Sequence, residues 1–310
     1  MPESFQFLSA DGKTQVHAEI FRPEGSPKAV LQLIHGMVEH IGRYRRFAEW
    51  LAGQGFVVAG HDHLGHGATG KPEDWGYFGA PDPSGLLVKD IHSLRERVQK
   101  EYPGLPYFML GHSMGSYLLR KYLTWHGEGL SGAVVMGTGF MPGAAAAGGL
   151  AVIHSAELLK GARHKSRTVE KLVFGSDYQH FDMSGKEPSR SWLTKDEDIV
   201  RQYYSDPRTT FRFTLNGYQG LVEAVRDACD PKGAARIPKD LPVLLISGAD
   251  DPVGSFGKGV RETETQLKQA GLKDVTCHLI EGDRHEVLNE TDREQVYGYL
   301  LDWFRAYLKG

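Results

Sequence analysis

Residues 106–115 read Pro-Tyr-Phe-Met-Leu-Gly-His-Ser-Met-Gly, so an apolar run leads directly into a Gly-x-Ser-x-Gly motif centred on Ser113. The run lacks the alternation of a half-buried strand and predicts a strand buried on both faces of a sheet. A helical pattern follows at residues 117–125. We therefore expect Ser113 at a sharp strand-to-helix turn, which would hold its hydroxyl at the carboxyl edge of the sheet. The flanking glycines remove side chains that would clash in such a turn.

Similar apolar runs recur along the chain and alternate with helical patterns. These further strand candidates are residues 29–34, 56–59, 133–136, 242–246 and 275–280. Apolar residues at helical spacing occur at residues 44–51, 87–98 and 296–307. Two runs near the N-terminus, residues 4–10 and 14–21, are joined at Asp11-Gly12 and predict an antiparallel hairpin. The alternation predicts an α/β fold with an open, mostly parallel, doubly wound sheet.

The alternation stops between about Gly139 and Thr214. This stretch contains 13 residues without a charge, 141–153, followed by basic residues and a polar patch. We expect a helical insertion at residues 139–214, within a core formed by residues 1–138 and 215–310. Two capping boxes are expected to begin helices, one at Thr194 and Glu197 inside the insertion and one at Thr291 and Glu294 near the C-terminus.

The composition argues against several classes of protein. The chain has 310 residues, of which 40% are apolar and 24% are charged, and its formal net charge is −3. A net charge so close to zero lacks the excess of basic residues that is typical of a nucleic-acid binder. The sequence contains no run of 18 apolar residues, the length needed to span a membrane. The first four residues do not resemble a signal peptide, and Cys229 and Cys277 are isolated, as suits a reducing compartment. We expect a soluble cytoplasmic protein that does not bind nucleic acid.

Ser113 would need a base to take its proton and an acid to orient that base. If the order along the chain is serine, acid, histidine, the base is His278 or His285, the two histidines beyond residue 180. His285 is favoured because it lies in a loop after a strand, whereas His278 lies within the strand. Asp250 and Asp251 both follow the run at residues 242–246, and their spacing leaves the choice between them open.

An oxyanion formed at Ser113 would need two backbone N–H donors. We expect one from Met114, which follows the serine, and one from Met37, which lies in the loop after the run at residues 29–34. This chemistry requires no metal and no organic cofactor, and we expect neither.

A zinc site is the rival interpretation of one histidine-rich segment. His61, His63 and His66 have the spacing of half of a metallo-β-lactamase-type motif, HxHxDH. However, Gly65 stands where that motif requires an aspartate. We therefore favour a hydrogen-bonded loop beside the site.

Three segments resemble the signatures of one family. Residues 35–44, His-Gly-Met-Val-Glu-His-Ile-Gly-Arg-Tyr, are similar to the HGxxEHxxRY segment of monoacylglycerol lipases and related lysophospholipase-like α/β-hydrolases. Residues 61–67, His-Asp-His-Leu-Gly-His-Gly, and the motif at 111–115 resemble two further signatures in the same order. The resemblance covers roughly residues 5–137 and 215–308. Ser116 departs from it, because the family usually has a second glycine there.

The resemblance implies the α/β-hydrolase fold and selects the catalytic acid. The family's Gly-x-x-Asp segment corresponds to residues 248–251 and therefore selects Asp251, while its histidine loop corresponds to Gly282 through His285. Ser113 is then the implied nucleophile. The implied activity is a serine ester hydrolase acting on monoacylglycerols, lysophospholipids or similar single-chain acyl esters through an acyl-enzyme.

The insertion would form a cap or lid over the acyl pocket, and transient contact with membranes or lipid aggregates is expected there. Two alternatives stay open. One is a short-chain carboxylesterase or aminopeptidase-like hydrolase with the same triad. The other is a non-catalytic ligand-binding protein of this fold.

Overall fold

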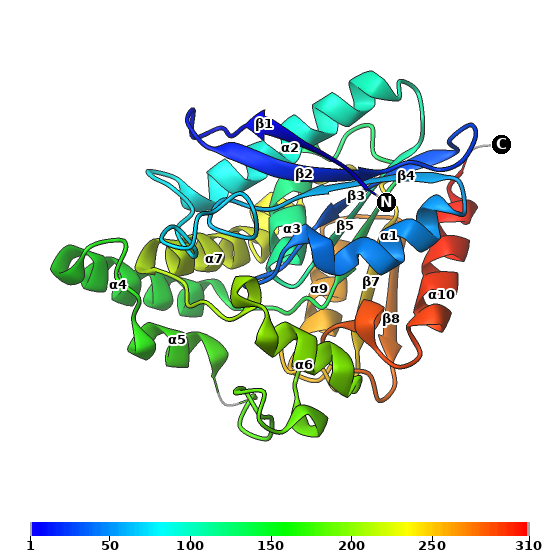
Figure 1. Cartoon of the computed structure of the whole chain (residues 1–310). Coiled ribbons are helices and arrows are strands. Elements are labelled where there is room, and N and C mark those ends of the chain that lie inside the picture. The colour runs from blue at the N-terminus through cyan, green and yellow to red at the C-terminus, as the bar shows by residue number, and fades with distance from the viewer. Residues whose placement is uncertain (1, 176, 309–310) are drawn as a thin grey trace.

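A computed structural model describes residues 2–175 and 177–308, and in these residues eight strands form one sheet (Figure 1). The strands are β1 (Glu3–Leu8), β2 (Gln15–Phe21), β3 (Ala29–Ile34), β4 (Phe56–His61), β5 (Tyr107–His112), β6 (Gly132–Met136), β7 (Val243–Gly248) and β8 (Val275–Ile280). Their order is β1-β2-β4-β3-β5-β6-β7-β8. The first two form the expected antiparallel hairpin, β2 pairs antiparallel with β4, and every other neighbouring pair is parallel. The predicted mostly parallel sheet is confirmed.

The register brings the carboxyl ends of the parallel strands to one edge. Ile34 of β3 pairs with Gly111 of β5, and Gly248 of β7 pairs with Ile280 of β8. The loops that follow these four strands therefore leave the sheet at the same edge. They contain all the residues that the sequence suggests for catalysis.

Helices cover both faces of the sheet. α1 (Arg45–Ala52) and α10 (Arg293–Ala306) contribute to one apolar cluster, while α2 (Pro83–Glu101), α3 (Met114–His126), α7 (Leu215–Ala228) and α9 (Lys258–Gln269) contribute to the other. Short elements are η1 (Ile41–Tyr44), α8 (Pro231–Ala234) and η4 (Val287–Asn289).

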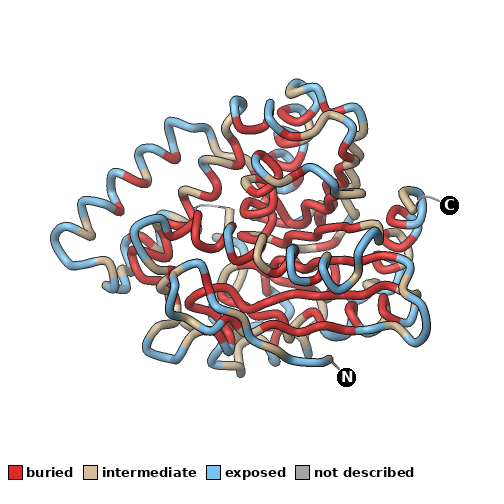
Figure 2. The backbone as a smooth tube through the Cα atoms, turned by 90° about the horizontal axis from the view of Figure 1, so that it is seen from above, coloured by how far each residue is buried: buried red, intermediate tan, exposed pale blue. Residues whose placement is uncertain are grey.

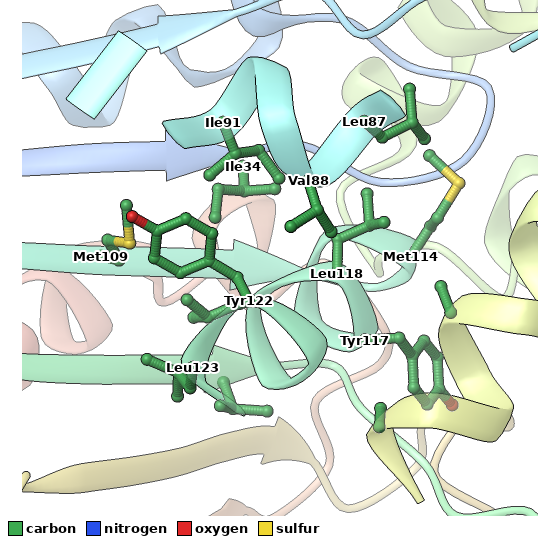
Figure 3. Packing of buried hydrophobic residues seen from close by; sticks show 14 of the residues in the cluster. Ile34, Leu87, Val88, Ile91, Met109, Met114, Tyr117, Leu118, Tyr122 and Leu123 are labelled. Carbon is green, nitrogen blue, oxygen red and sulfur yellow. The ribbon is translucent and has the colours of Figure 1, made fainter. Parts of the chain in front are cut away.

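Successive residues of each central strand point to opposite clusters. Met109 of β5 belongs to the cluster on the α3 side, whereas Phe108 and Leu110 belong to the cluster on the α1 side. Figure 3 shows the first cluster, in which Tyr122 of α3 lies beside Met109. Burial on both faces explains why these strands read as continuous apolar runs.

Both predicted capping boxes are wrong. The insertion's helix α6 (Glu197–Ser205) is capped by Asp196, whose carboxylate accepts hydrogen bonds from the N–H groups of its first turn. Thr194 instead donates its hydroxyl to the carbonyl of Asn289, at 3.0 Å. α10 begins after Asp292 without a side-chain cap. The two helices thus begin one or two residues later than the pattern predicts.

Between β6 and α7 the chain forms α4 (Gly143–Lys160), α5 (Arg167–Phe174), η2 (Pro188–Arg190), α6 and η3 (Pro207–Thr209). Figure 2 shows α4 extending from the body with most of its surface exposed. Its buried residues are Ala146, Leu150 and Ile153. We refer to α4 and α5 together as the arm and to residues 188–209 as the inner segment. The domain boundaries at 138 and 215 stay a prediction.

Arg120 of α3 ties the start of the insertion to the core. Its side chain is buried, at 1% exposure, and its guanidinium donates to the carbonyl of Gly139 (3.0 Å), where the insertion starts. It also donates to the carbonyl of Ala228 (3.0 Å), at the end of α7, and to the side-chain oxygen of Gln266 (2.9 Å) in α9. These partners are dipoles that together solvate a buried cation.

We expect Arg120→Met to lower the free energy of unfolding by about 2–4 kcal/mol, because the buried Ala228 and Gln266 oxygens lose their donor. Urea unfolding followed by circular dichroism measures the change. The matched control is Arg226→Met, which removes a half-exposed arginine paired with Asp227 and should cost less than about 1 kcal/mol. Equal losses in the two variants would contradict the assigned role.

Candidate active site

Ser113 occupies a strained turn between β5 and α3. Its φ is +54° and its ψ is −122°, in a region that residues with a side chain rarely adopt. A Cβ at Gly115 would lie 2.1 Å from the carbonyl oxygen of Ile34, and one at Gly111 would lie 2.3 Å from that of Gly115. Both motif glycines are therefore required by backbone contacts. The predicted strand-to-helix turn is confirmed.

The structure brings Asp251 and His285 together. His285 Nδ1–H donates to Asp251 Oδ2 at 3.0 Å, and both side chains are buried. The same carboxylate accepts the Ser247 hydroxyl (3.1 Å) and the backbone N–H of Val253 (2.9 Å), which fix its orientation. Asp250, by contrast, is exposed. The geometry thus distinguishes Asp251 from Asp250, which their spacing in the sequence could not do.

Ser113 and His285 line one cavity of about 370 Å³ at the carboxyl edge of the sheet. Within the described residues no hydrogen bond joins the serine hydroxyl to the imidazole. Such contacts are often long before substrate binds. The far wall of the cavity is apolar and includes Phe140, Met141, Val173, Leu221, Val222 and Val225.

The loop after β3, residues 35–40, approaches the serine closely. A Cβ at Gly36 would lie 2.8 Å from Ser113 Cβ, so only glycine fits there. Met37 and Met114 both line the cavity with Ser113, as expected for candidate oxyanion donors. In the part of the chain that the structure describes, neither backbone N–H donates to another backbone or side-chain group outside regular helices and strands. We refer to residues 35–40 as the oxyanion loop.

Buried histidines support this loop. The His63 N–H donates to His35 Nε2 at 3.0 Å, and the Val38 N–H donates to His66 Nε2 at 3.4 Å. Burial lowers the pKa of His66 to about 4 and that of His61 to about 3, so these rings are neutral near pH 7. A neutral imidazole can accept a backbone hydrogen bond, which the charged form cannot.

The histidine-rich segment therefore forms a hydrogen-bonded support next to the oxyanion loop. No group of three His, Cys, Asp or Glu side chains that could hold a metal ion is found among residues 2–175 and 177–308.

A buried network of charges connects the loops, and the sequence interpretation did not identify it. His112 donates from Nδ1 to Glu39 (3.1 Å) and from Nε2 to the carbonyl of His285 (3.2 Å). Arg43 forms a bidentate ion pair with Glu286, with one N···O distance of 2.7 Å. It also contacts Glu39 at 3.3 Å. Glu39, Arg43 and His112 lie inside the recognised motifs, so the motifs could have suggested them, whereas only its position next to His285 points to Glu286.

The network keeps His112 charged beside the candidate triad. Burial alone would lower the pKa of His112, but the hydrogen bond and charge of Glu39 raise it above its usual value. Burial would likewise raise the pKa of Glu39, yet His112 and Arg43 lower it to about 2. Both ring nitrogens of His112 can then act as donors, as their partners require.

The insertion contributes side chains that sequence reasoning also missed. The Trp192 ring stacks on the His285 ring with centroids 4.9 Å apart. The backbone N–H of Glu286 donates to the carbonyl of Leu193 at 2.7 Å, and the Tyr203 hydroxyl donates to the carbonyl of Val38 at 3.1 Å. The inner segment therefore contacts both the histidine loop and the oxyanion loop. Its residues have no local motif that marks them.

Comparisons with known proteins agree with this geometry. The model of a family described as serine aminopeptidase, S33, matches residues 25–292. Human monoglyceride lipase is 39% identical over 108 residues, which are 35% of this chain and 34% of the human protein, so the match spans about a third of that relative's length. The monoacylglycerol lipase of Mycolicibacterium smegmatis is 24% identical over 301 residues, or 96% of this chain and 95% of the relative.

Solved structures agree on the fold. A thermostable carboxyl esterase from Bacillus coagulans is 31% identical, with a TM-score of 0.91 and 99% of both chains covered. A soluble variant of the monoglyceride lipase from Saccharomyces cerevisiae has a TM-score of 0.80 at 18% identity, with 100% of this chain and 96% of that chain covered. The fold is the α/β-hydrolase fold, as the resemblance implied.

Proposed function

The chain belongs to the serine aminopeptidase, S33, family of α/β-hydrolases, and from this premise we propose that it is a serine hydrolase of single-chain lipid esters. The proposed substrates are of the monoacylglycerol or lysophospholipid type, cleaved through an acyl-enzyme. The observation that carries the proposal is the Asp251–His285 hydrogen bond at the wall of a cavity that also contains Ser113 on its strained turn.

In the proposed mechanism Ser113 attacks the ester carbonyl while His285 accepts its proton and then donates it to the leaving alcohol. Asp251, which accepts the Nδ1–H, selects the tautomer whose Nε2 can take that proton and stabilises the imidazolium. Water activated by His285 then releases the fatty acid. No metal or organic cofactor is needed for these steps.

The Met37 and Met114 backbone N–H groups would bind the oxyanion of each tetrahedral intermediate. Met114 is the first residue of α3, so the positive end of the helix dipole adds to its N–H. Donors fixed before the reaction stabilise developing charge at little reorganisation cost.

The cavity supports an acyl chain on one side and an alcohol without net charge on the other. Its apolar wall, formed by α7, α5 and the start of the insertion, suits a single hydrocarbon chain. Its polar end contains Glu39 and Glu286, but Arg43 and His112 already pair with them. This pairing argues against an aminopeptidase, which would use a carboxylate to bind the substrate's ammonium group.

A short-chain carboxylesterase is the second candidate, and the likeness to the carboxyl esterase favours it. It would share the triad and differ in how much of the apolar wall the acyl group fills. Burying each further methylene contributes about 0.8 kcal/mol, so the two candidates predict different dependences on chain length.

We also propose that the arm contacts lipid aggregates. Leu158 and Leu159, at the end of α4, are 90% and 83% exposed, and Leu172 of α5 is also exposed. Exposed apolar groups of this kind are typical of surfaces that insert into a lipid interface. No helix in the described ranges has the length and apolar character needed to cross a bilayer.

We expect Asp251→Asn to slow labelling by a fluorophosphonate probe by about 100-fold or more, because the imidazole loses the partner that sets its tautomer. Asp250→Asn, a change of the same chemistry one residue away, should stay within about two-fold of wild type, as an exposed position predicts. Ser113→Ala should abolish labelling. Equal loss in both aspartate variants would reject Asp251 as the acid, and labelling of Ser113→Ala would reject the nucleophile.

For 1-monoacylglycerols of increasing acyl length, kcat/KM should rise from butyryl to dodecanoyl as methylenes fill the apolar wall. Each added methylene is worth up to about four-fold if fully buried. Steady-state hydrolysis below the aggregation limit measures the series. A maximum at butyryl followed by a steep fall would support the carboxylesterase instead.

The double variant Leu158→Glu/Leu159→Glu should hydrolyse monoacylglycerol in phosphatidylcholine vesicles about ten-fold more slowly, because two leucines no longer enter the interface. Its rate on a soluble acetyl ester should change less than two-fold. Trp125→Glu, which replaces an exposed aromatic residue of α3, is the control and should leave both rates unchanged. An unchanged vesicle rate in the double variant would argue against the arm as the contact.

A further inference from the structure

We propose that Tyr203, which the insertion supplies, is a positioning residue that holds the oxyanion loop in its reactive geometry through the carbonyl group of Val38. The inference rests on the proposed function of Ser113 and the Met37 N–H. It assigns to the inner segment a role in the chemical step, in addition to covering the acyl chain.

The oxyanion loop has a backbone that needs external support. Val38 has a φ of +52°, a value that is costly for a β-branched residue. Its N–H donates to His66 Nε2 at 3.4 Å, and its carbonyl accepts the Tyr203 hydroxyl at 3.1 Å. The strained residue is therefore held on one side by the core and on the other by the insertion. It directly follows Met37, whose N–H is the candidate oxyanion donor.

Tyr203 also contacts the charge network that connects the two catalytic loops. Its ring lies over the Arg43 guanidinium, 4.8 Å from the ring centroid, and Arg43 pairs with Glu286 next to His285. Burial raises the pKa of the Tyr203 hydroxyl, so it remains a donor throughout the working pH range. One side chain thus contacts the oxyanion loop and the residue that organises the histidine loop.

The rest of the inner segment is attached to the same place. Trp192 stacks on His285, and Leu193 accepts the Glu286 N–H. α6 is consequently held against the site by the residues just before it and by its own Tyr203, whereas most of α4 in the arm is exposed. If α6 were displaced, the carbonyl of Val38 would lose its donor and the strained turn would be free to relax.

Relaxation of this turn should weaken transition-state binding more than substrate binding, because an oxyanion forms only after attack. Tyr203→Phe removes the hydroxyl and keeps the ring over Arg43. We expect kcat to fall roughly ten-fold, the size of one lost hydrogen bond, with KM within about two-fold of wild type. The inhibition constant of an alkyl trifluoromethyl ketone, whose adduct has an oxyanion, should rise in parallel. The dissociation constant of a non-hydrolysable alkylglycerol ether should not change.

The matched control is Tyr299→Phe, the same change on α10, because the Tyr299 ring stacks on His278 of β8 and does not line the cavity. It should keep wild-type kcat and ketone inhibition. Equal losses in the two variants, or a Tyr203→Phe loss that appears in KM and ether binding, would overturn the positioning role. If wild type itself is not labelled by the fluorophosphonate at Ser113, the proposed function fails. Wild-type labelling with an unaffected Tyr203→Phe enzyme would reject the inference alone.

Discussion

The close approach of two backbones at the carboxyl ends of β3 and β5 is the constraint on which the rest of the site depends. The Gly36 Cα lies so near Ser113 that a methyl group would meet the serine Cβ at 2.8 Å, and a methyl at Gly115 would meet the Ile34 carbonyl at 2.1 Å. Ser113 has its positive φ beside this contact, and the Met37 segment lines the same cavity. Parallel pairing then delivers the loops after β7 and β8, with Asp251 and His285, to the same edge.

Buried ionisable side chains at this edge are accommodated in two different ways. His61 and His66 lie where desolvation dominates, so they are neutral, and His66 accepts a hydrogen bond from the Val38 N–H. His112 is equally buried, but the carboxylate of Glu39 keeps it charged. Arg43 and Glu286 pair with each other in the same network, since a buried charge without a partner would be costly. The four charges of Glu39, Arg43, His112 and Glu286 thereby compensate one another.

The insertion combines two kinds of structure. The arm rests on α7 through a few buried residues of α4 and exposes leucines at its end. The inner segment instead forms hydrogen bonds and ring contacts with the catalytic loops, through Trp192, Leu193 and Tyr203. Arg120 anchors the start of the insertion, at Gly139, and joins it to the end of α7 at Ala228.

Sequence alone determined the features that depend on short-range pattern. The buried strands and the turn at Ser113 follow from apolar runs and from glycines whose backbone contacts lie within a few residues or one strand away. Spacing left Asp250 and Asp251 equivalent, because a loop residue's direction depends on where the chain turns, and the resemblance rather than geometry favoured Asp251. Thr194 failed as a cap because the helix begins two residues later than the pattern suggests, after Asp196, whose carboxylate accepts the first N–H groups. Only the tertiary structure decided the roles of Glu286, Trp192 and Tyr203. Each acts on a group far away in sequence that only the folded chain brings within hydrogen-bond or ring-stacking distance.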